Sequence, residues 1–349
     1  MSRRAEGIRR LRGPLLRWYR RHRRDLPWRE TRDPYSIWVS EIMLQQTQVA
    51  TVVPYYRRFL ERFPSVHDLA AATEEAVLSV WSGLGYYRRA RALHAASRLI
   101  VDRYDGRVPD EATELRSLPG IGRYTAGAIA SMAYGREEPV LDGNVRRVLC
   151  RIRGLSGRDE AELWEIALTL VRGDSPGDLN QGLMELGARI CTPRSPGCAH
   201  CPVRSGCTAA ASGNPEAHPA PRPARPAEKV RVAVALTRRG GRILLERPGG
   251  NSPLRGTWDL PAVEVASTVD PRARIEKELG RRHGLTIEAG HRTATASHGI
   301  LHRRLTLELF ECRLVRGRPS ECEDLRWIRP TDVTETAVSG ATRKLLLSR

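Results

Sequence analysis

Residues 118–134 read LPGIGRYTAGAIASMAY, a glycine-rich turn followed by a helical pattern. Gly120 and Gly122 permit a tight turn, and the helix after it would present free backbone amides at its N-terminus. Such amides hold a phosphate group without sequence preference. A turn of this kind can also be no more than a short connection between two helices. The charge of the chain helps to decide between these two interpretations.

The chain is strongly basic, with a formal net charge of +18 at pH 7. Residues 1–32 contain 12 arginines and three acidic residues. Trp18, Tyr19 and Trp28 are interleaved with these arginines, which favours a segment that docks onto a polyanion over a solubilising tail. We therefore expect nucleic acid as the partner. Residues 116–134, with Leu118, Gly120 and Gly122 at the turn, are interpreted as a helix-hairpin-helix that binds the DNA backbone.

Length and composition bound the possible classes of protein. A chain of 349 residues favours two domains, and 40% hydrophobic with 28% charged residues is typical of a globular protein. No apolar run approaches the roughly 18–20 residues that span a bilayer, and the arginine-rich start lacks the apolar stretch of a signal peptide. We expect neither membrane insertion nor export, and a cytoplasmic, nucleoid-associated protein of a bacterium.

The secondary-structure pattern changes after residue 208. Residues 1–208 predict an all-α domain, because helical patterns alternate with short turns and β-branched alternation is scarce. Residues 209–228 are rich in Pro, Ala and Arg and predict a semi-extended linker. Residues 229–349 predict a smaller α+β domain. Its expected elements are strands at Val230–Thr237, Ile243–Glu246 and Leu305–Leu309, a turn at Gly240-Gly241, and helices at Arg272–Arg282 and Ala341–Leu347.

Four cysteines lie close together in a loop rich in Pro, Gly and Ser. They are Cys191, Cys198, Cys201 and Cys207. This spacing suits one soft metal centre, either an iron–sulfur cluster or a structural zinc, and does not choose between them. Disulfides are disfavoured in the cytosol. Cys150, Cys312 and Cys322 lie in apolar or strand contexts and are predicted to be small core or surface residues.

Several motifs occur in a characteristic order along the chain. They are Ser40–Thr47 (SEIMLQQT), Gly83–Tyr87 (GLGYY), the turn at 118–122, Leu141–Val145 (LDGNV) and the four-cysteine loop. Together they resemble the MutY-type adenine DNA glycosylases of the endonuclease III superfamily, over nearly the whole chain. The resemblance implies two helical subdomains with DNA between them, one 4Fe-4S cluster on the four cysteines, and a C-terminal Nudix-like domain that senses 8-oxoguanine.

Two carboxylates could perform the reaction that the resemblance implies. Breaking the bond between adenine and deoxyribose requires a proton for the leaving base and stabilisation of a cationic sugar. Glu41 lies in an apolar helical stretch that should raise its pKa, and by resemblance it is the general acid. Asp142 lies at a turn before a helix, where backbone amides favour its ionised form, and should face the sugar; it can also act as a helix cap. By resemblance, Asn144 and Tyr124 hydrogen-bond around the carboxylates.

Tyr124 bears on whether the DNA strand is also cut. By resemblance, this position holds a lysine in relatives that form a Schiff base with the sugar. The chain has three lysines, and the first is Lys229, so the helical domain has none. We therefore predict a monofunctional glycosylase that leaves an abasic site.

The resemblance also assigns residues that contact the bases once adenine is extruded from the duplex. Gln46 and Tyr86 are expected to wedge near the opposing purine, with Leu44 beside them. Helix packing is the alternative role for Tyr86, but Gly83 and Gly85 beside it favour close approach to another backbone and hence the wedge. The adenine pocket is expected to be formed by five further residues. Trp28, one of the five, could instead be a core residue. The set is Arg24, Leu26, Trp28, Arg29 and Gln181.

In the C-terminal domain, Thr257–Pro261 and the pair Ser297-His298 match the pattern of the family. The helix at 274–285 has only two glutamates, Glu276 and Glu278, too few for the metal site of a Nudix hydrolase, so we expect recognition of 8-oxoguanine and not hydrolysis. The family usually has Phe before its Ser-His pair, whereas this chain has Ala296. That departure leaves the neighbouring apolar contact in doubt.

The expected activity is therefore removal of adenine mispaired with 8-oxoguanine or guanine, by a monomer acting on double-stranded DNA. The alternative within the superfamily is a mismatch thymine or uracil DNA glycosylase, which ordinarily lacks the C-terminal domain. A nucleotide pyrophosphatase would need the missing carboxylate-rich helix. A catalytically inactive DNA sensor would be expected to lose Glu41 or Asp142, and both are present.

Overall fold

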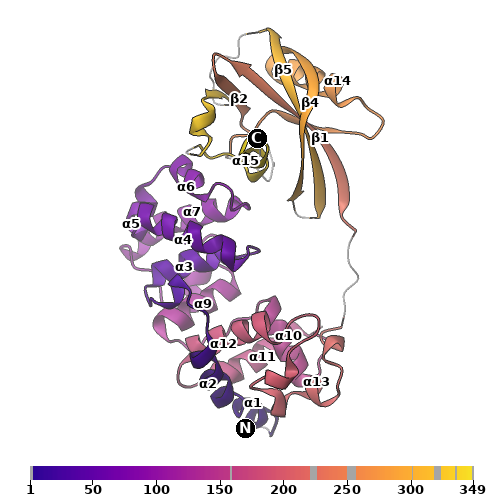
Figure 1. Cartoon of the computed structure of the whole chain (residues 1–349). Coiled ribbons are helices and arrows are strands. Elements are labelled where there is room, and N and C mark those ends of the chain that lie inside the picture. The colour runs from indigo at the N-terminus through magenta and orange to yellow at the C-terminus, as the bar shows by residue number, and fades with distance from the viewer. Residues whose placement is uncertain are drawn as a thin grey trace. The chain divides into compact units, whose positions relative to one another are not determined.

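The computed structural model describes residues 3–157, 159–220, 226–249, 257–300, 302–317, 324–334 and 336–347. The chain divides into two compact units (Figure 1). The first comprises Met1–Ala70 and Ala95–Pro223, and the second comprises Ala71–His94 and Ala224–Arg349. The expected combination of an all-α part with a smaller α+β part is confirmed.

The first unit is built of helices. Those before residue 112 are α1 (Arg3–Arg9), α2 (Arg12–His22), the 3-10 turn η1 (Pro27–Arg29), α3 (Pro34–Leu44), α4 (Val49–Arg62), α5 (Val66–Ala71) and α7 (Arg88–Tyr104), which contains the boundary between the units. The later ones are α8 (Ala112–Arg116), α9 (Arg123–Tyr134), α10 (Gly143–Arg153), α11 (Glu160–Val171) and α12 (Pro176–Arg189).

Local sequence signals fix the ends of the helices that hold functional residues. Asp33 caps α3, because its Oδ2 accepts a hydrogen bond from the Ser36 amide (2.8 Å). Helix α9 begins after Gly122 and ends at Gly135, which has a left-handed conformation (φ 70°). Helix α3 packs against α4 and α9, and α12 packs against α2, α9 and α10. The C-terminal end of α3 is thereby held near the start of α9.

The segment after the four cysteines is more ordered than the expected linker. Residues 208–220 contain α13 (Thr208–Ala211) and a 3-10 turn η4 (Pro215–Ala217), and Ala209 is fully buried. The His218 carbonyl accepts a hydrogen bond from Arg151 Nε (3.0 Å). These residues therefore pack onto the helices. In the rest of the expected linker, Pro226 and Ala227 belong to no helix or strand, while 221–225 lie outside the described residues.

The second unit contains a six-stranded mixed sheet in the order β4-β5-β1-β2-β6, with β3 paired to β1. Its strands are β1 (Glu228–Arg239), β2 (Arg242–Glu246), β3 (Ala262–Val265), β4 (Thr286–Ile300), β5 (Arg303–Arg316) and β6 (Leu325–Ile328). Strands β1 and β5 are parallel, and the other pairs are antiparallel. Gly240 and Gly241 both have positive φ at the turn between β1 and β2, as the sequence predicts.

Side chains alternate along β1 between two cores, as expected for a sheet buried on both faces. Val232, Val234 and Leu236 belong to the core that includes Leu345 of α15 (Gly340–Leu347). Ala233 and Ala235 belong to the core that includes Ile275 and Leu279 of α14 (Pro271–His283). One helix therefore covers each face of the sheet.

The second unit also includes residues 71–94, with α6 (Glu74–Trp81) and the start of α7. The segment between these helices contains three residues with positive φ, namely Gly83, Gly85 and Tyr86. Elsewhere, Cys150 and Cys312 are buried, while Cys322 lies outside the described residues. Within the part of the chain that is described, no helix has both the length and the apolar character needed to cross a bilayer.

Candidate active site

A cavity of about 570 Å³ in the first unit brings together most of the residues singled out from the sequence. Both carboxylates, Glu41 and Asp142, line this one space. The other expected residues around it are Arg24, Leu26, Trp28, Arg29, Leu44, Gln46, Tyr124, Asn144 and Gln181. A nucleobase with its sugar is small enough for a cavity of this volume.

Glu41 is a buried acid with one free oxygen. It lies on α3 between apolar residues, and the residue is only 4% exposed. Burial raises the pKa of Glu41 to about 7, while the Tyr124 hydroxyl beside it acts in the opposite direction. Its Oε2 atom is buried and has no hydrogen-bond partner among the described residues. A protonated Glu41 can therefore donate its proton to a group placed in the cavity.

Tyr124, on α9, faces the same acid. Its hydroxyl donates a hydrogen bond to Met184 Sδ (3.1 Å). Burial, together with the nearby Glu41 and Asp142, holds the pKa of Tyr124 well above its usual value. The phenol therefore stays neutral and acts only as a hydrogen-bonding group.

Asp142 caps α10, as the sequence suggests. Its Oδ1 accepts a hydrogen bond from the Val145 amide (2.7 Å), and its Oδ2 lies 3.4 Å from Asn144 Nδ2. The net pKa of Asp142 is nevertheless raised, because burial outweighs the backbone bonds that favour its charged form. The backbone amides lower the pKa of Asp142, as expected, but the sequence does not reveal how deeply this turn is buried.

Glu185 is a residue of this cavity that the sequence analysis missed. Its side chain is fully buried and accepts hydrogen bonds from Arg24 Nε (2.8 Å) and Arg29 Nη2 (2.9 Å). Burial alone would raise the pKa of Glu185, but the two arginines lower it to about 2. Helical spacing could have revealed Glu185, because it lies four residues after Gln181 on α12 and therefore on the same face of that helix.

Gln181 and Trp28 form further parts of the lining. The amide oxygen of Gln181 accepts a hydrogen bond from the Tyr19 hydroxyl (2.8 Å), so its amide nitrogen is the group oriented to donate. Trp28 packs edge-to-face against Tyr56, with ring centroids 5.4 Å apart, and is almost buried. Trp28 therefore serves both the core and the cavity wall.

The turn before α9 has an open approach to its backbone. The backbone at position 120 has a positive φ (78°), which favours glycine there. The buried Leu118 side chain holds the turn against the core. Gly122 has an ordinary φ of −88°, and a Cβ built on it would meet nothing within 4 Å. A glycine at this position thus leaves the amides at the start of α9 accessible to an external phosphate.

The four cysteines of the loop line a single small cavity. Its walls are mostly apolar, with Val148, Ile152 and Leu186 among them. Arg151 Nη1 donates to Cys191 Sγ (3.3 Å), and Cys207 Sγ donates to the Arg151 carbonyl (3.3 Å). In the described chain, no three His, Cys, Asp or Glu side chains form a group suited to a single metal ion. The four thiols thus line one common space.

Three of the expected DNA-contacting residues belong to the second unit. Tyr86 has a left-handed backbone (φ 50°) and is 38% exposed. Ser297 and His298 lie on β4, opposite Thr306 and Leu305 of β5. Burial and Lys344 lower the pKa of His298, so the imidazole is neutral at pH 7.

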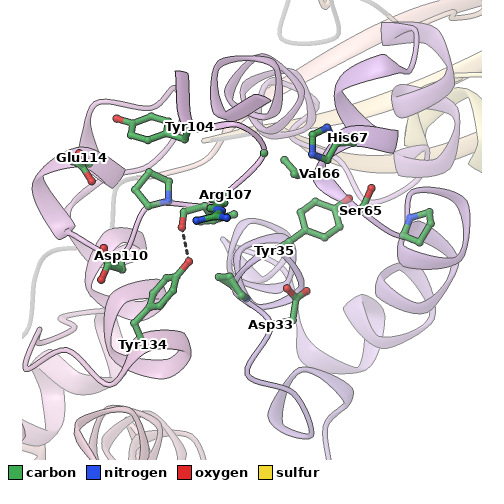
Figure 2. A pocket seen from close by; sticks show the side chains of 15 residues that line it. Asp33, Tyr35, Ser65, Val66, His67, Tyr104, Arg107, Asp110, Glu114 and Tyr134 are labelled. Atoms are coloured by element: carbon green, nitrogen blue, oxygen red, sulfur yellow. Dashed lines mark hydrogen bonds between the residues drawn. The ribbon is translucent and has the colours of Figure 1, made fainter. Parts of the chain in front are cut away.

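A second cavity of the first unit, of about 690 Å³, has a different character (Figure 2). Two of its acidic residues have structural roles, since Asp33 caps α3 and Asp110 pairs with Arg136. The Tyr134 hydroxyl donates to the Val108 carbonyl, the hydrogen bond drawn as a dashed line in Figure 2. Glu41 and Asp142 are not among its lining residues.

Comparisons of sequence agree with both parts of the fold. Residues 39–172 match the family described as HhH-GPD superfamily base excision DNA repair protein, and residues 232–348 match the NUDIX domain. The human adenine DNA glycosylase is 36% identical over 399 residues, which cover 96% of this chain and 73% of the human protein. The adenine DNA glycosylase of Arabidopsis thaliana is 37% identical and covers 87% of this chain and 57% of that protein.

Two solved structures are similar to the helical part. A thermostable thymine-DNA glycosylase has a TM-score of 0.57 and 32% identity, covering 60% of this chain and all of that one. A non-covalent complex of endonuclease III with DNA has a TM-score of 0.53, covering 60% of this chain and 97% of that one. Its identity of 24% shows a shared fold alone.

Proposed function

The chain belongs to the adenine DNA glycosylases, and we propose from this premise that it removes adenine paired with 8-oxoguanine or guanine and leaves an abasic site. Base excision by cleavage of the N-glycosidic bond of adenine is the activity of its family. The observation that carries the proposal is the shared cavity of Glu41 and Asp142.

Glu41 is proposed as the general acid. Its raised pKa keeps the carboxyl protonated up to about pH 7, and its unpartnered Oε2 faces no competing protein group among the described residues. The acid transfers its proton to a ring nitrogen of the extruded adenine as the bond between the base and the sugar breaks. The bonding electron pair leaves with adenine, which departs as a neutral base.

Asp142 is proposed to stabilise the cationic sugar that remains. The amide of Val145 and the side chain of Asn144 hold its carboxylate in a fixed orientation. Water then adds to the sugar carbon and gives its proton to the Glu41 carboxylate, which restores the starting state. Tyr124 orients the Glu41 carboxyl through its neutral hydroxyl.

Strand cleavage through an amine is not part of this mechanism. The lining residues of the cavity include no lysine, and the first lysine of the chain is Lys229. A Schiff base requires an amine that attacks the sugar carbon. We therefore infer a monofunctional enzyme.

The four cysteines fit an iron–sulfur cluster. Cys191, Cys198, Cys201 and Cys207 would hold a 4Fe-4S cluster, since four thiols around one apolar space supply the ligands that such a cluster needs. The cluster would fix the loop 191–207 to the helices beside it. Iron and sulfide analysis of the purified protein tests this assignment, and stoichiometric zinc in their place would overturn it.

Recognition of the opposing base is proposed to involve Gln46, Tyr86, Ser297 and His298. A neutral imidazole and a hydroxyl can each both donate and accept a hydrogen bond, which suits the edge of an oxidised guanine. The exposed ring of Tyr86 offers a surface for stacking. The partner is accordingly double-stranded DNA containing the mispair, bound by a monomer.

Single-turnover base release from a panel of duplexes tests the proposed function. The panel places adenine opposite 8-oxoguanine, guanine or cytosine, and thymine opposite guanine, because the helical part also resembles a thymine-DNA glycosylase. We expect fast adenine release opposite 8-oxoguanine and guanine, and slow release opposite cytosine. Thymine release, or no dependence on the opposing base, would contradict the proposal. Borohydride should trap no covalent adduct.

A further inference from the structure

The loop Ser82–Tyr87 between α6 and α7 is tightly held, although it carries an exposed aromatic ring. The Gly85 carbonyl accepts hydrogen bonds from Trp81 Nε1 (3.1 Å) and Arg89 Nη2 (3.2 Å). The Arg89 guanidinium also lies 5.5 Å from the centre of the Tyr86 ring. Tyr86 has a positive φ (50°), which costs a non-glycine residue free energy that the surrounding contacts must offset, whereas Gly83 and Gly85 adopt positive φ without strain.

A second set of contacts connects this loop to the segment 338–343 of the same unit. The Val338 carbonyl accepts hydrogen bonds from Ser82 Oγ (2.6 Å) and the Tyr87 hydroxyl (3.0 Å). Ser82 Oγ in turn accepts from Arg343 Nη2 (3.0 Å). Ser82, Tyr87 and Val338 are almost completely buried. Water therefore does not compete for these bonds.

The Tyr87 hydroxyl connects both sides of this contact. It accepts a hydrogen bond from the Gly83 amide (3.3 Å) while donating to the Val338 carbonyl. Gly83 has a φ of 98°, so its amide orientation determines how the chain enters the turn that presents Tyr86. One hydroxyl thus couples the loop backbone to the segment 338–343.

The segment 338–343 is itself fixed to the sheet domain. Val338 forms a parallel bridge with Trp258, whose amide donates to the Ala337 carbonyl (2.8 Å). Ser339 Oγ and Thr342 Oγ1 both donate to Asp259 Oδ1, a buried carboxylate. The Val338 carbonyl is therefore held rigidly in the orientation that receives Ser82 and Tyr87.

We propose that Tyr87 and Ser82 are positioning residues that use the Val338 carbonyl to hold the Tyr86 ring in the conformation that meets the opposing base. The proposal rests on the DNA-contacting role proposed for Tyr86. It assigns to the C-terminal part of the chain a second task besides contacts through Ser297 and His298. That task is to set the geometry of a loop encoded more than 240 residues earlier.

A double-mutant cycle on the full chain tests this proposal. Tyr87→Phe and Ser82→Ala are each made alone and together with Tyr86→Ala. Single-turnover adenine excision and duplex affinity are measured with adenine opposite guanine, 8-oxoguanine or a tetrahydrofuran abasic analogue. We expect each single substitution to impair excision opposite a purine by roughly 5- to 30-fold, the effect of one lost buried hydrogen bond. Opposite the abasic analogue, which offers Tyr86 no base, excision should stay within about twofold of wild type.

In the Tyr86→Ala background, Tyr87→Phe and Ser82→Ala should have no further effect, because residues that act through one group are not additive. Tyr35→Phe is the matched control, since it removes another buried tyrosine hydroxyl that donates to a backbone carbonyl, that of Phe63 (2.9 Å), in the first unit. It should leave all excision rates unchanged. Thermal unfolding of each variant separates loss of stability from loss of positioning.

The outcomes distinguish this inference from the proposed function. If Tyr86→Ala leaves excision unchanged, the role of Tyr86 is wrong, and the positioning role falls with it. If Tyr86→Ala impairs excision but Tyr87→Phe and Ser82→Ala do not, only the positioning role is overturned. Additive losses, or equal losses opposite the abasic analogue, would also overturn it. The base panel described above tests the activity itself and does not depend on these variants.

Discussion

Glu41 and Glu185 are two buried glutamates on one cavity, and their surroundings move their pKa values in opposite directions. Burial raises the pKa of Glu41 to about 7, whereas Arg24 and Arg29 overcome burial and lower the pKa of Glu185 to about 2. One carboxyl is therefore kept available as a proton donor, and the other is a permanent anion. The different roles of Glu41 and Glu185 therefore follow from the groups that surround each carboxyl.

The titration of Glu41 predicts a pH-dependent stability difference between wild type and Glu41→Gln. The folded-state pKa of about 7 lies above the reference value of 4.5, so the carboxyl's contribution to stability is fully present below about pH 4.5 and is lost as the pH rises to about 7. The amide of the variant does not titrate. Between about pH 5 and about pH 8, the free energy of unfolding of the variant should gain about 3 kcal/mol relative to wild type.

Denaturant titrations at several pH values measure this difference. A difference between wild type and Glu41→Gln that stays constant with pH would mean that Glu41 has an ordinary pKa in the folded protein.

For single residues, the sequence predicts those properties that depend on residues nearby in the chain. The apolar stretch around Glu41 predicts its desolvation, and the turn before α10 predicts the capping role of Asp142. Glu185 was missed because Arg24 and Arg29 precede it by more than 150 residues. Local patterns do not encode which distant charge a buried acid will meet.

The contact between α10 and α12 fixes the turn that carries Asp142. Gly187 of α12 lies directly against Asn144, and a Cβ on Gly187 would come within 2.7 Å of Asn144 Cβ. Gly187→Ala should therefore destabilise the protein by about 1–3 kcal/mol and slow adenine excision, because α10 must shift. Thermal unfolding and single-turnover kinetics measure the two effects.

Gly7→Ala provides the control, since Gly7 is also helical and a Cβ there would meet nothing within 4 Å. It should be neutral or slightly stabilising. Unchanged stability and excision in Gly187→Ala would show that the helix contact has no part in holding Asp142.

At the level of elements, the sequence patterns predict whether a segment is a helix or a strand and roughly where it begins and ends. The strand expected at Val230–Thr237 lies within β1, and the helix expected at Arg272–Arg282 lies within α14. The composition of residues 209–220 suggested a linker, yet α13 and η4 form there because Ala209 and His218 pack onto the helices. Tertiary contacts outweigh weak local propensity in such a segment.

The whole molecule carries a large excess of positive charge. A net charge of +18 predicts binding to undamaged duplex DNA that is dominated by release of counterions. The logarithm of the affinity should fall linearly with the logarithm of salt concentration, with a slope steeper than about −5, between about 50 and 200 mM salt. Excision at saturating enzyme should change little over this range.

Fluorescence anisotropy with an undamaged duplex provides the slope. A shallow slope of about −1 would show that few of the basic side chains of the protein contact phosphates. The same titration with a mispaired duplex separates the contribution of the bases from that of the backbone.

The family resemblance predicted the two-part organisation of the molecule from a few motifs, and the domain matches and relatives confirm it. The grouping of residues 71–94 with the C-terminal unit was not predictable. Buried hydrogen bonds from Ser82 and Tyr87 to the Val338 carbonyl connect the two segments, which share no local sequence pattern. Contacts of such long sequence separation become visible only in the folded chain.

Comparison of wild type with Glu41→Gln on a duplex containing adenine opposite 8-oxoguanine tests the central claim most directly. Single-turnover release of adenine and duplex affinity are measured on the same preparations. We predict that release falls by about 100- to 10,000-fold, the usual contribution of a general acid, while affinity stays within about threefold of wild type. Release within about tenfold of wild type at unchanged affinity would show that the departing base takes its proton from another group.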